Sequence, residues 1–311
     1  MRLGVSLAPV GRLADPVSVR SAATAAEQVG YASVWVDDAL RCRRPEGFSG
    51  PAGADADSPA GEPTVALDPL SVLTYAAAVT DRVRLGTSVL VAPWYRPALL
   101  ARSLTSLDVL SDGRLTVGLG LGGRLDELAA MGVPQDELGR RLDDALDMLD
   151  TVWAPVGGRQ DDRGTGRAAP SLPPPVQRPR PPVLLATSTP EGLDRVARRA
   201  DGWNPTGLPV ETLPSLWARV RDTAAGYGRA PDALELVVHA DLAVSDRPID
   251  RDRPSYAGTI EQVAADIADT RRAGAHEVIL CLQGDHCLDE TLDVYARIAE
   301  AVDVTMPTRT G

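Results

Sequence analysis

The stretch from Asp81 to Gly123 reads DRVRLGTSVLVAPWYRPALLARSLTSLDVLSDGRLTVGLGLGG. It contains an apolar run at Val83–Val91, a run with helical spacing of apolar residues at Pro97–Leu110, and a second apolar run at Leu115–Leu119. A strand, a helix and a further strand in this order indicate parallel strands joined by a crossover helix. The stretch therefore predicts a fold of the α/β class.

The same alternation runs through the rest of the chain. The expected strands are Arg2–Ala8, Ser33–Val36, Val83–Val91, Leu115–Leu119, Pro182–Thr187, Asp201–Asn204, Leu234–Val244 and His276–Leu282. The expected helices are Val17–Val29, Pro69–Val79, Pro97–Leu110, Arg140–Trp153, Glu191–Arg199, Leu213–Tyr227, Ile260–Ala273 and Leu288–Val302. Eight strands alternating with eight helices predict a closed (β/α)8 TIM barrel, whose active-site residues follow the carboxyl ends of the strands. An open, doubly wound sheet is the alternative.

Two segments interrupt this alternation. Residues 41–67 follow the second expected strand and residues 154–181 precede the fifth, and both are rich in glycine, proline and charged residues. This composition is typical of loops. The first insertion leaves the active-site end of the barrel, so it is either a lid over the site or a surface insertion. The whole chain, residues 1–311, is otherwise expected to be a single barrel domain.

Charge and composition exclude several classes of protein. The net charge is −11 and no basic run stands out, so nucleic acid is not an expected partner. All 32 basic residues are arginine, which excludes a Walker-type phosphate loop, a pyridoxal Schiff base and a lysine aldolase. No apolar run approaches the roughly 20 residues that span a bilayer, and no signal-peptide pattern is visible. We therefore expect a cytoplasmic protein without a membrane partner.

Cysteine and histidine residues give few signals of their own. Cys42, Cys281 and Cys287 form an odd and sparse set, which predicts reduced thiols rather than disulfides. Cys281 and Cys287 cluster with His286, but a second pair at zinc spacing is missing, so no metal site is expected. His239 lies inside an apolar strand and can point into the barrel, although a buried, hydrogen-bonded histidine is the favoured interpretation.

The glycine run at the end of the opening stretch admits two interpretations. Gly118, Gly120 and Gly123 have the G-x-G-x-x-G spacing of a dinucleotide-binding turn. Such a turn leads through a helix to a strand that ends in an acidic residue, whereas residues 124–153 are helical in pattern. The glycines therefore either let a different ligand approach the backbone or make a tight turn.

The block from Asp81 to Trp153 strongly resembles the bacterial luciferase-like monooxygenase superfamily, including its branch that uses the deazaflavin coenzyme F420. The resemblance is carried by RLGT, a strand and P-x-x-RP, by SLDVLSDGRL, by the glycine run and by GRRLDDALDMLDTVW. The segments GYASVWVDD, PPPVQRPRPPVLLATSTPEGL and ARRADGWNP extend it over most of the chain. It implies a TIM-barrel oxidoreductase that binds F420 or FMN, acts on a small organic substrate and forms a homodimer.

The resemblance also implies where the cofactor binds. The ring lies against the ends of the third and fourth strands, and the cofactor phosphate lies at the turn ATSTPEG, where a helix begins. The implied contacts are Asp38, Ser88, Val89, Gly120, Leu121, Gly122, Ala186, Thr187, Ser188 and Thr189. A non-proline cis peptide is implied between Ser88 and Val89. Ser188 or Thr189 can also cap the helix, and Ser188 has capping-box spacing with Glu191.

The chemistry needs a proton source near the ring. Many F420-dependent relatives have a histidine after the second strand beside an acidic residue; here WVDDAL keeps Asp38 and has Ala39 in the place of the histidine. Gly123 replaces a glutamate of the glucose-6-phosphate dehydrogenases, which disfavours sugar-phosphate oxidation. The candidate catalytic residues are Asp38, Tyr95 and His286. The central block favours an F420-dependent oxidoreductase over an FMN-dependent monooxygenase or a non-catalytic flavin-binding relative.

Overall fold

A closed barrel of eight parallel strands forms the centre of the molecule. The computed structural model describes residues 1–40, 65–154, 172–284 and 286–302. The barrel strands, in the order of their neighbours, are β1 (Arg2–Ser6), β2 (Ser33–Val36), β3 (Arg84–Thr87), β5 (Leu115–Gly120), β6 (Val183–Leu185), β7 (Gly202–Trp203), β8 (Glu235–Val244) and β10 (Glu277–Leu282). β10 pairs with both β8 and β1, which closes the sheet. The TIM barrel is thus confirmed and the open sheet is wrong.

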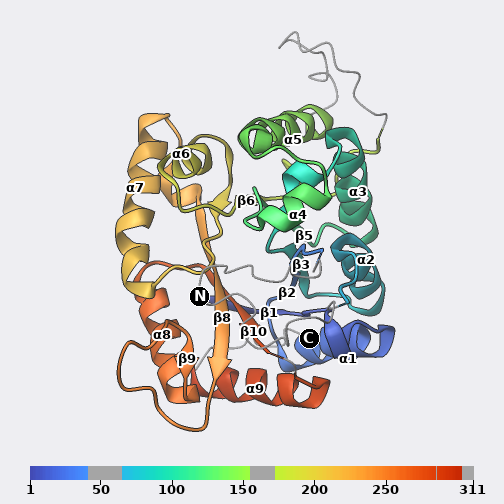
Figure 1. Ribbon diagram of the computed structural model, residues 1–311. Helices are drawn as coiled ribbons and strands as arrows, with labels where there is room; N and C mark the ends of the chain where they lie inside the picture. The colour runs from blue at the N-terminus through green and yellow to red at the C-terminus, as the bar shows by residue number, and fades with distance from the viewer. Residues whose placement is uncertain (41–64, 155–171, 285, 303–311) are drawn as a thin grey trace.

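Helices form a ring around this barrel (Figure 1). They are α1 (Pro16–Val29), α2 (Pro69–Val79), α3 (Pro97–Leu110), α5 (Leu138–Trp153), α6 (Pro190–Arg199), α7 (Leu213–Gly226), α8 (Ile260–Arg272) and α9 (Leu288–Ala301). Short side chains fix where several of them begin, because an oxygen of the residue before the helix accepts a free amide of the first turn. These capping residues include Asp15, Asp68, Thr189 and Thr259.

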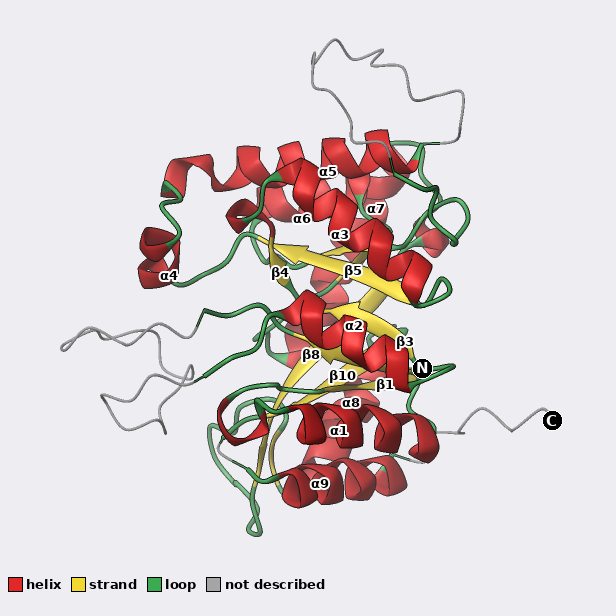
Figure 2. Cartoon of the chain, turned by 90° about the vertical axis from the view of Figure 1, so that its right-hand side faces the viewer, coloured by secondary structure: helices red, strands yellow, loops and turns green. Residues whose placement is uncertain are grey.

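Several short elements lie between the main strands and helices. They are β4 (Leu90–Val91), β9 (Ala257–Gly258), α4 (Leu125–Ala130) and the 3₁₀ turns at Gly11–Leu13, Ala92–Trp94, Gln135–Glu137, Val210–Thr212 and Pro231–Ala233. β4 pairs with β5, and β9 pairs with β8. Figure 2 shows α4 at the end of the barrel towards which β5 points. This carboxyl end of the strands faces the viewer in Figure 1, and we call it the barrel mouth.

The inside of the barrel is layered. Trp35, Leu184, Val237 and Ile279 form a small buried apolar cluster apart from the main core. Because alternate residues of a strand face the same side, the residues two positions beyond Val237 and Ile279 also face inwards, towards the mouth. These are His239 and Cys281. The fold therefore places polar groups above an apolar layer, at the end where the strands finish.

Some expected elements differ from the structure. The single strand at Val83–Val91 is two strands, β3 and β4, because the chain leaves the sheet at Ser88 and Val89, where the non-proline cis peptide is confirmed. The α4 helix lies within residues 124–153, which are helical in pattern, but it was not among the eight expected helices. Residues 172–181 of the second insertion are ordered against α3, where the Asp108 carboxylate accepts the Val176 amide at 2.7 Å.

Other expectations fall outside what the structure describes. Residues 41–64 and 155–171, which make up most of the two insertions, lie outside the described residues, as does Cys42. Cys281 and Cys287 are free thiols. In the described part of the chain, no helix is both long enough and apolar enough to cross a bilayer.

Candidate active site

The glycine run and the segment Ser88–Val91 pack directly on one another at the barrel mouth. A side-chain carbon added at Gly118 would overlap the carbonyl oxygen of Thr87. A carbon added at Gly120 would lie 2.7 Å from a methyl group of Val89, well inside contact distance. The glycines therefore have a packing role within the chain: they let the irregular segment lie flat on β5. The cofactor contact implied for Gly120, Leu121 and Gly122 stays a prediction.

Asp38 is a carboxylate that hydrogen-bonds to the segment Ser88–Val91. It follows β2, and its backbone N–H donates to the Val89 carbonyl at 3.2 Å. Its Oδ2 accepts the Val91 amide at 3.1 Å and the Tyr95 hydroxyl at 2.9 Å. Burial raises the pKa of Asp38 to about 6, and the two hydrogen bonds oppose this rise only in part. A carboxyl group with this pKa can both give and take a proton near neutral pH.

Tyr95 and Trp94 add two polar groups on the same rim. Burial, together with the nearby Asp38 charge, raises the pKa of Tyr95 above its usual range, so the hydroxyl stays protonated and donates to Asp38. The indole Nε1 of Trp94 is buried and has no hydrogen-bond partner among the described residues. An orphaned N–H is costly to bury, and a bound ligand with an acceptor atom would satisfy it.

The turn between β6 and α6 forms the next part of the rim. The Ala186 amide donates to the Leu119 carbonyl at 2.9 Å, which joins this turn to the end of β5. Thr189 is the N-cap of α6 and accepts the Gly192 amide at 3.1 Å. Of the two expected caps, Thr189 is confirmed, and the capping box of Ser188 with Glu191 is wrong because Ser188 lies one residue before the N-cap. Ser188 is exposed beside the helix N-terminus.

His239 has polar contacts that the sequence pattern did not predict. It is buried, as expected, but its partners are polar residues at the barrel mouth: Nδ1 lies 2.9 Å from Ser88 Oγ, and Nε2 lies 3.4 Å from Asp241 Oδ1. Burial alone lowers the pKa of His239, but hydrogen bonds to Asp241 and Cys281 outweigh it and hold the pKa well above its usual range. The spacing of His239 and Asp241, two residues apart near the end of a strand, was the available signal.

The groups around His239 are hydrogen-bonded to one another. Ligand atoms of His239, Asp241 and Cys281 lie within 4.8 Å of one another, a spacing that a metal ion could use. The amide of Gln283, however, donates to Asp241 Oδ1 at 2.9 Å and reaches Cys281 Sγ at 3.3 Å. We therefore interpret these side chains as a hydrogen-bonded group.

His286 lies apart from the groups described above. Its Nε2 is 2.9 Å from the Gln283 carbonyl oxygen, and its Nδ1 is 3.9 Å from a carboxylate oxygen of Glu290 in α9. These contacts order the loop that leads into α9. The described contacts of His286 do not include Asp38 or Tyr95, so the three candidate catalytic residues do not form one group.

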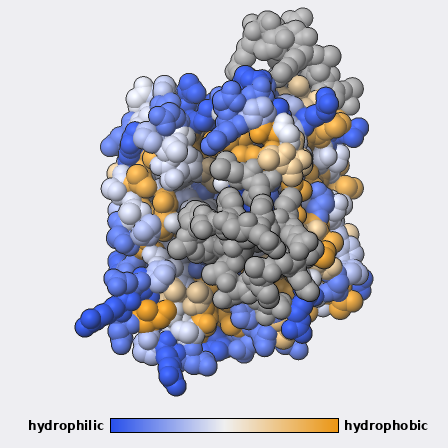
Figure 3. Space-filling view, viewed as in Figure 1, coloured by the Kyte–Doolittle hydropathy of each residue, from blue (hydrophilic) through white to orange (hydrophobic). Residues whose placement is uncertain are grey.

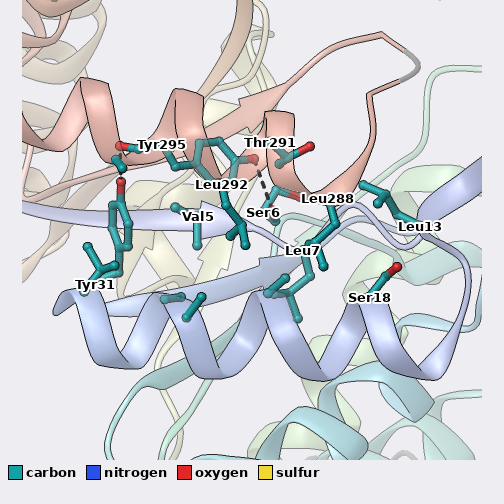
Figure 4. A pocket seen from close by; sticks show the side chains of 15 residues that line it. Val5, Ser6, Leu7, Leu13, Ser18, Tyr31, Leu288, Thr291, Leu292 and Tyr295 are labelled. Atoms are coloured by element: carbon teal, nitrogen blue, oxygen red, sulfur yellow. Dashed lines mark hydrogen bonds between the residues drawn. The ribbon is translucent and has the colours of Figure 1, made fainter.

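A separate apolar cleft lies on the outer wall, between α1, α9 and β1 (Figure 4). Its volume is about 50 Å³, and it is lined by side chains such as Leu7, Leu288 and Leu292. The hydroxyls of Tyr31 and Tyr295 at its edge are bonded to backbone carbonyls. It therefore lacks free catalytic groups. On the face that Figure 3 shows, apolar side chains lie among hydrophilic ones around the residues drawn in grey.

Comparison with known proteins agrees with this geometry. The family model for luciferase-like monooxygenases matches residues 2–278. The chain belongs to this family. Family membership makes it a luciferase-like oxidoreductase.

Luciferase-like relatives of this chain differ in what their names describe. An uncharacterised protein of Mycobacterium tuberculosis is 32% identical over 273 residues, which cover 81% of this chain and 94% of the relative. An F420-dependent glucose-6-phosphate dehydrogenase of Beutenbergia cavernae is 33% identical over 70% of this chain and 61% of that protein. The crystal structure of a monooxygenase from Streptomyces bottropensis superposes with a TM-score of 0.75 at 24% identity, covering 97% of this chain and 98% of that one.

Proposed function

We propose that this protein is an F420-dependent oxidoreductase that transfers a hydride between the deazaflavin and a small organic substrate. The observation that carries the proposal is the hydrogen-bonded pair of Asp38 and Tyr95, in which the carboxyl pKa is about 6. This pair lies beside the glycine run and the segment Ser88–Val91 at the barrel mouth. An F420-dependent relative at 33% identity supports the choice of cofactor.

The residues at the mouth fit a flavin-type cofactor. When bound, the cofactor supplies the hydride chemistry, and the protein supplies orientation and protons. Val89, Gly120 and Gly122 would support the ring, and the buried N–H of Trp94 offers a donor for one of its acceptor atoms. Ser188, exposed just before the N-cap of α6, would bind the phosphate together with free amides of the first turn of the helix. Asp38 would hold a proton on Oδ1, the oxygen for which no hydrogen bond is described.

An FMN-dependent monooxygenase is the second candidate, supported by the description of the family model. A relative that binds a cofactor without turnover is the third, because Ala39 stands where F420-dependent relatives have a histidine. Gly123, at the position of a glutamate in the glucose-6-phosphate dehydrogenases, argues against a sugar-phosphate substrate.

Titration of the apoprotein with F420 and, separately, with FMN tests the proposal, with bound and free cofactor distinguished by fluorescence. We expect tighter binding of F420, weakened by Ser188→Ala, followed by consumption of reduced F420 with an organic acceptor. Tighter binding of FMN, with oxygen consumption that needs reduced FMN, would replace the proposal by the monooxygenase. Binding of neither cofactor would leave the glycines with their packing role alone.

We further propose that the protein is a cytoplasmic homodimer with a small-molecule substrate and no nucleic-acid or membrane partner. The support is the family membership for the dimer, and the net charge of −11 for the absence of a nucleic-acid partner. Light scattering after size-exclusion chromatography tests the dimer. A mass near 32.8 kDa, that of one chain, would contradict it.

A further inference from the structure

The hydrogen bonds around Ser88 determine which nitrogen of His239 carries a proton. The amide Nδ2 of Asn204 donates to the Val237 carbonyl at 2.7 Å, so its Oδ1 faces Ser88 and accepts the Ser88 hydroxyl at 2.8 Å. The hydroxyl has one proton, and that proton points at Asn204. Ser88 Oγ therefore meets Nδ1 of His239, 2.9 Å away, with a lone pair, and Nδ1 must be the donor.

The other nitrogen of His239 faces the carboxylate that reaches solvent. The side chain of His239 is 7% exposed and that of Asp241 is 44% exposed. Nε2 and Asp241 Oδ1 are 3.4 Å apart, longer than a strong hydrogen bond, so Nε2–H is not held in a short ion pair. Among the described residues, the titratable groups that face the ring are Asp241 from β8 and Cys281 from β10, and the neutral Ser88, which donates to Asn204, faces Nδ1.

We propose that His239, in addition to Asp38, is a proton donor and acceptor of this site, that it exchanges the proton with the substrate, and that Asp241 connects it to solvent. The inference rests on the proposed function, because it gives the hydride-transfer reaction the proton source that Ala39 does not provide. His239 hydrogen-bonds to Ser88, which directly follows β3, so its ring lies beside the segment Ser88–Val91, where the cofactor ring is proposed to bind. Because Nδ1 donates its hydrogen bond to Ser88, the proton on Nε2 is the one that can be transferred to a substrate.

The step conserves atoms and electrons with a carbonyl substrate. A reduced deazaflavin, when bound, would supply the hydride to the carbonyl carbon, and Nε2 of His239 would give its proton to the carbonyl oxygen as the C=O double bond opens. An alcohol results, and Nε2 regains a proton from solvent through Asp241. In the oxidising direction neutral Nε2 accepts the alcohol proton while the hydride leaves the carbon.

The first test needs no substrate. The chain has three histidines, so ¹⁵N-histidine labelling gives three imidazoles that single substitutions assign. We expect a protonated Nδ1 on His239 at every pH and a ring that stays charged above the usual range of a histidine pKa. Asp241→Asn should move the titration of His239 to lower pH by at least one unit. A bare Nδ1, or an unchanged titration in Asp241→Asn, would overturn the inference.

The second test measures turnover of reduced F420 with a panel of small aldehydes and ketones. His239→Gln should lower the rate at least roughly 100-fold, the usual contribution of a general acid, with F420 affinity within about threefold of wild type. His276→Gln is the matched control, because that ring accepts the Leu236 amide at 3.0 Å at the opposite end of the barrel. A His239→Gln rate close to wild type would overturn the inference alone. No turnover in the wild type would instead contradict the proposed function, and the inference with it.

Discussion

The two ends of the barrel both bury polar side chains, on either side of the layer formed by Trp35 and its apolar neighbours. At the amino end, Glu277 accepts the indole N–H of Trp35 at 3.1 Å, the Ser33 hydroxyl and the guanidinium Nε of Arg2 at 2.9 Å. Arg2 also reaches Glu235 at 2.8 Å. At the mouth, by contrast, Asp38 is surrounded by neutral donors.

The difference between the two ends indicates that the polar residues at the amino end stabilise the barrel, whereas those at the mouth are suited to proton transfer. Charges at the amino end face opposite charges, so their hydrogen bonds hold the strands together. At the mouth the pKa of Asp38 is raised to about 6, so this carboxyl group exchanges protons near neutral pH, and the pKa of His239 is held well above its usual range by its hydrogen bonds to Asp241 and Cys281. A TIM barrel uses its two ends in this way because only the carboxyl end carries the variable loops.

The largest effect is expected at the amino end. Glu277→Ala removes the acceptor of buried donors on Ser33 and Trp35 and leaves Arg2 with one partner. We expect the free energy of unfolding to fall by about 3 kcal/mol, the lower range for breaking a buried pair, since Arg2 is partly exposed. Urea denaturation measures it, with Glu277→Gln, which keeps an acceptor, as the milder control. A loss below about 1 kcal/mol would show that this end contributes little to stability.

A glycine at the mouth should give the next largest effect. Gly118→Ala places a methyl group against the Thr87 carbonyl, so β5 and the Ser88 segment must separate, at a cost of about 1 to 3 kcal/mol. We also expect F420 affinity to fall at least roughly tenfold. A carbon added at Gly123 meets nothing within 4 Å, so Gly123→Ala should change neither quantity. Equal effects of the two substitutions would remove the packing role assigned to the glycine run.

Much of this arrangement follows from local pattern, and the rest depends on contacts between distant residues. Apolar runs and helical spacing predicted the strands and the helices, and the count of eight alternating units predicted their closure into a barrel. The break at Ser88 was not predicted from the residue pattern, because VRLGTSVLV at Val83–Val91 is typical of one continuous strand and the packing on Gly118 and Gly120 depends on residues distant in the sequence. The surroundings of His239 were missed for the same reason. Ser88 and Asn204 lie 151 and 35 positions before it.

The raised pKa of Asp38 predicts how stability depends on pH. The folded state holds this proton to a pKa of about 6 and the unfolded chain only to about 3.8, so the folded state binds more protons between these values. Stability should therefore fall by about 1 to 2 kcal/mol as pH rises through this window, allowing for partial exposure of the side chain. Asp38→Asn should remove the fall. Tyr95→Phe, which deletes a donor to the carboxylate, should extend it to higher pH, and identical pH profiles for all three proteins would contradict the assignment.

The smallest effects are expected at the turn between β6 and α6, where one residue caps the helix and its neighbour is proposed to bind the cofactor phosphate. Thr189 caps α6 and Ser188 does not, so Thr189→Ala should cost about 1 kcal/mol of stability and Ser188→Ala almost nothing. If α6 receives the cofactor phosphate, Ser188→Ala should weaken F420 binding several-fold because it removes a hydroxyl beside the free amides. Thermal unfolding and fluorescence titration measure the two effects in the same samples. Weaker binding by Thr189→Ala alone would mean that the order of the helix end, rather than the Ser188 hydroxyl, controls binding.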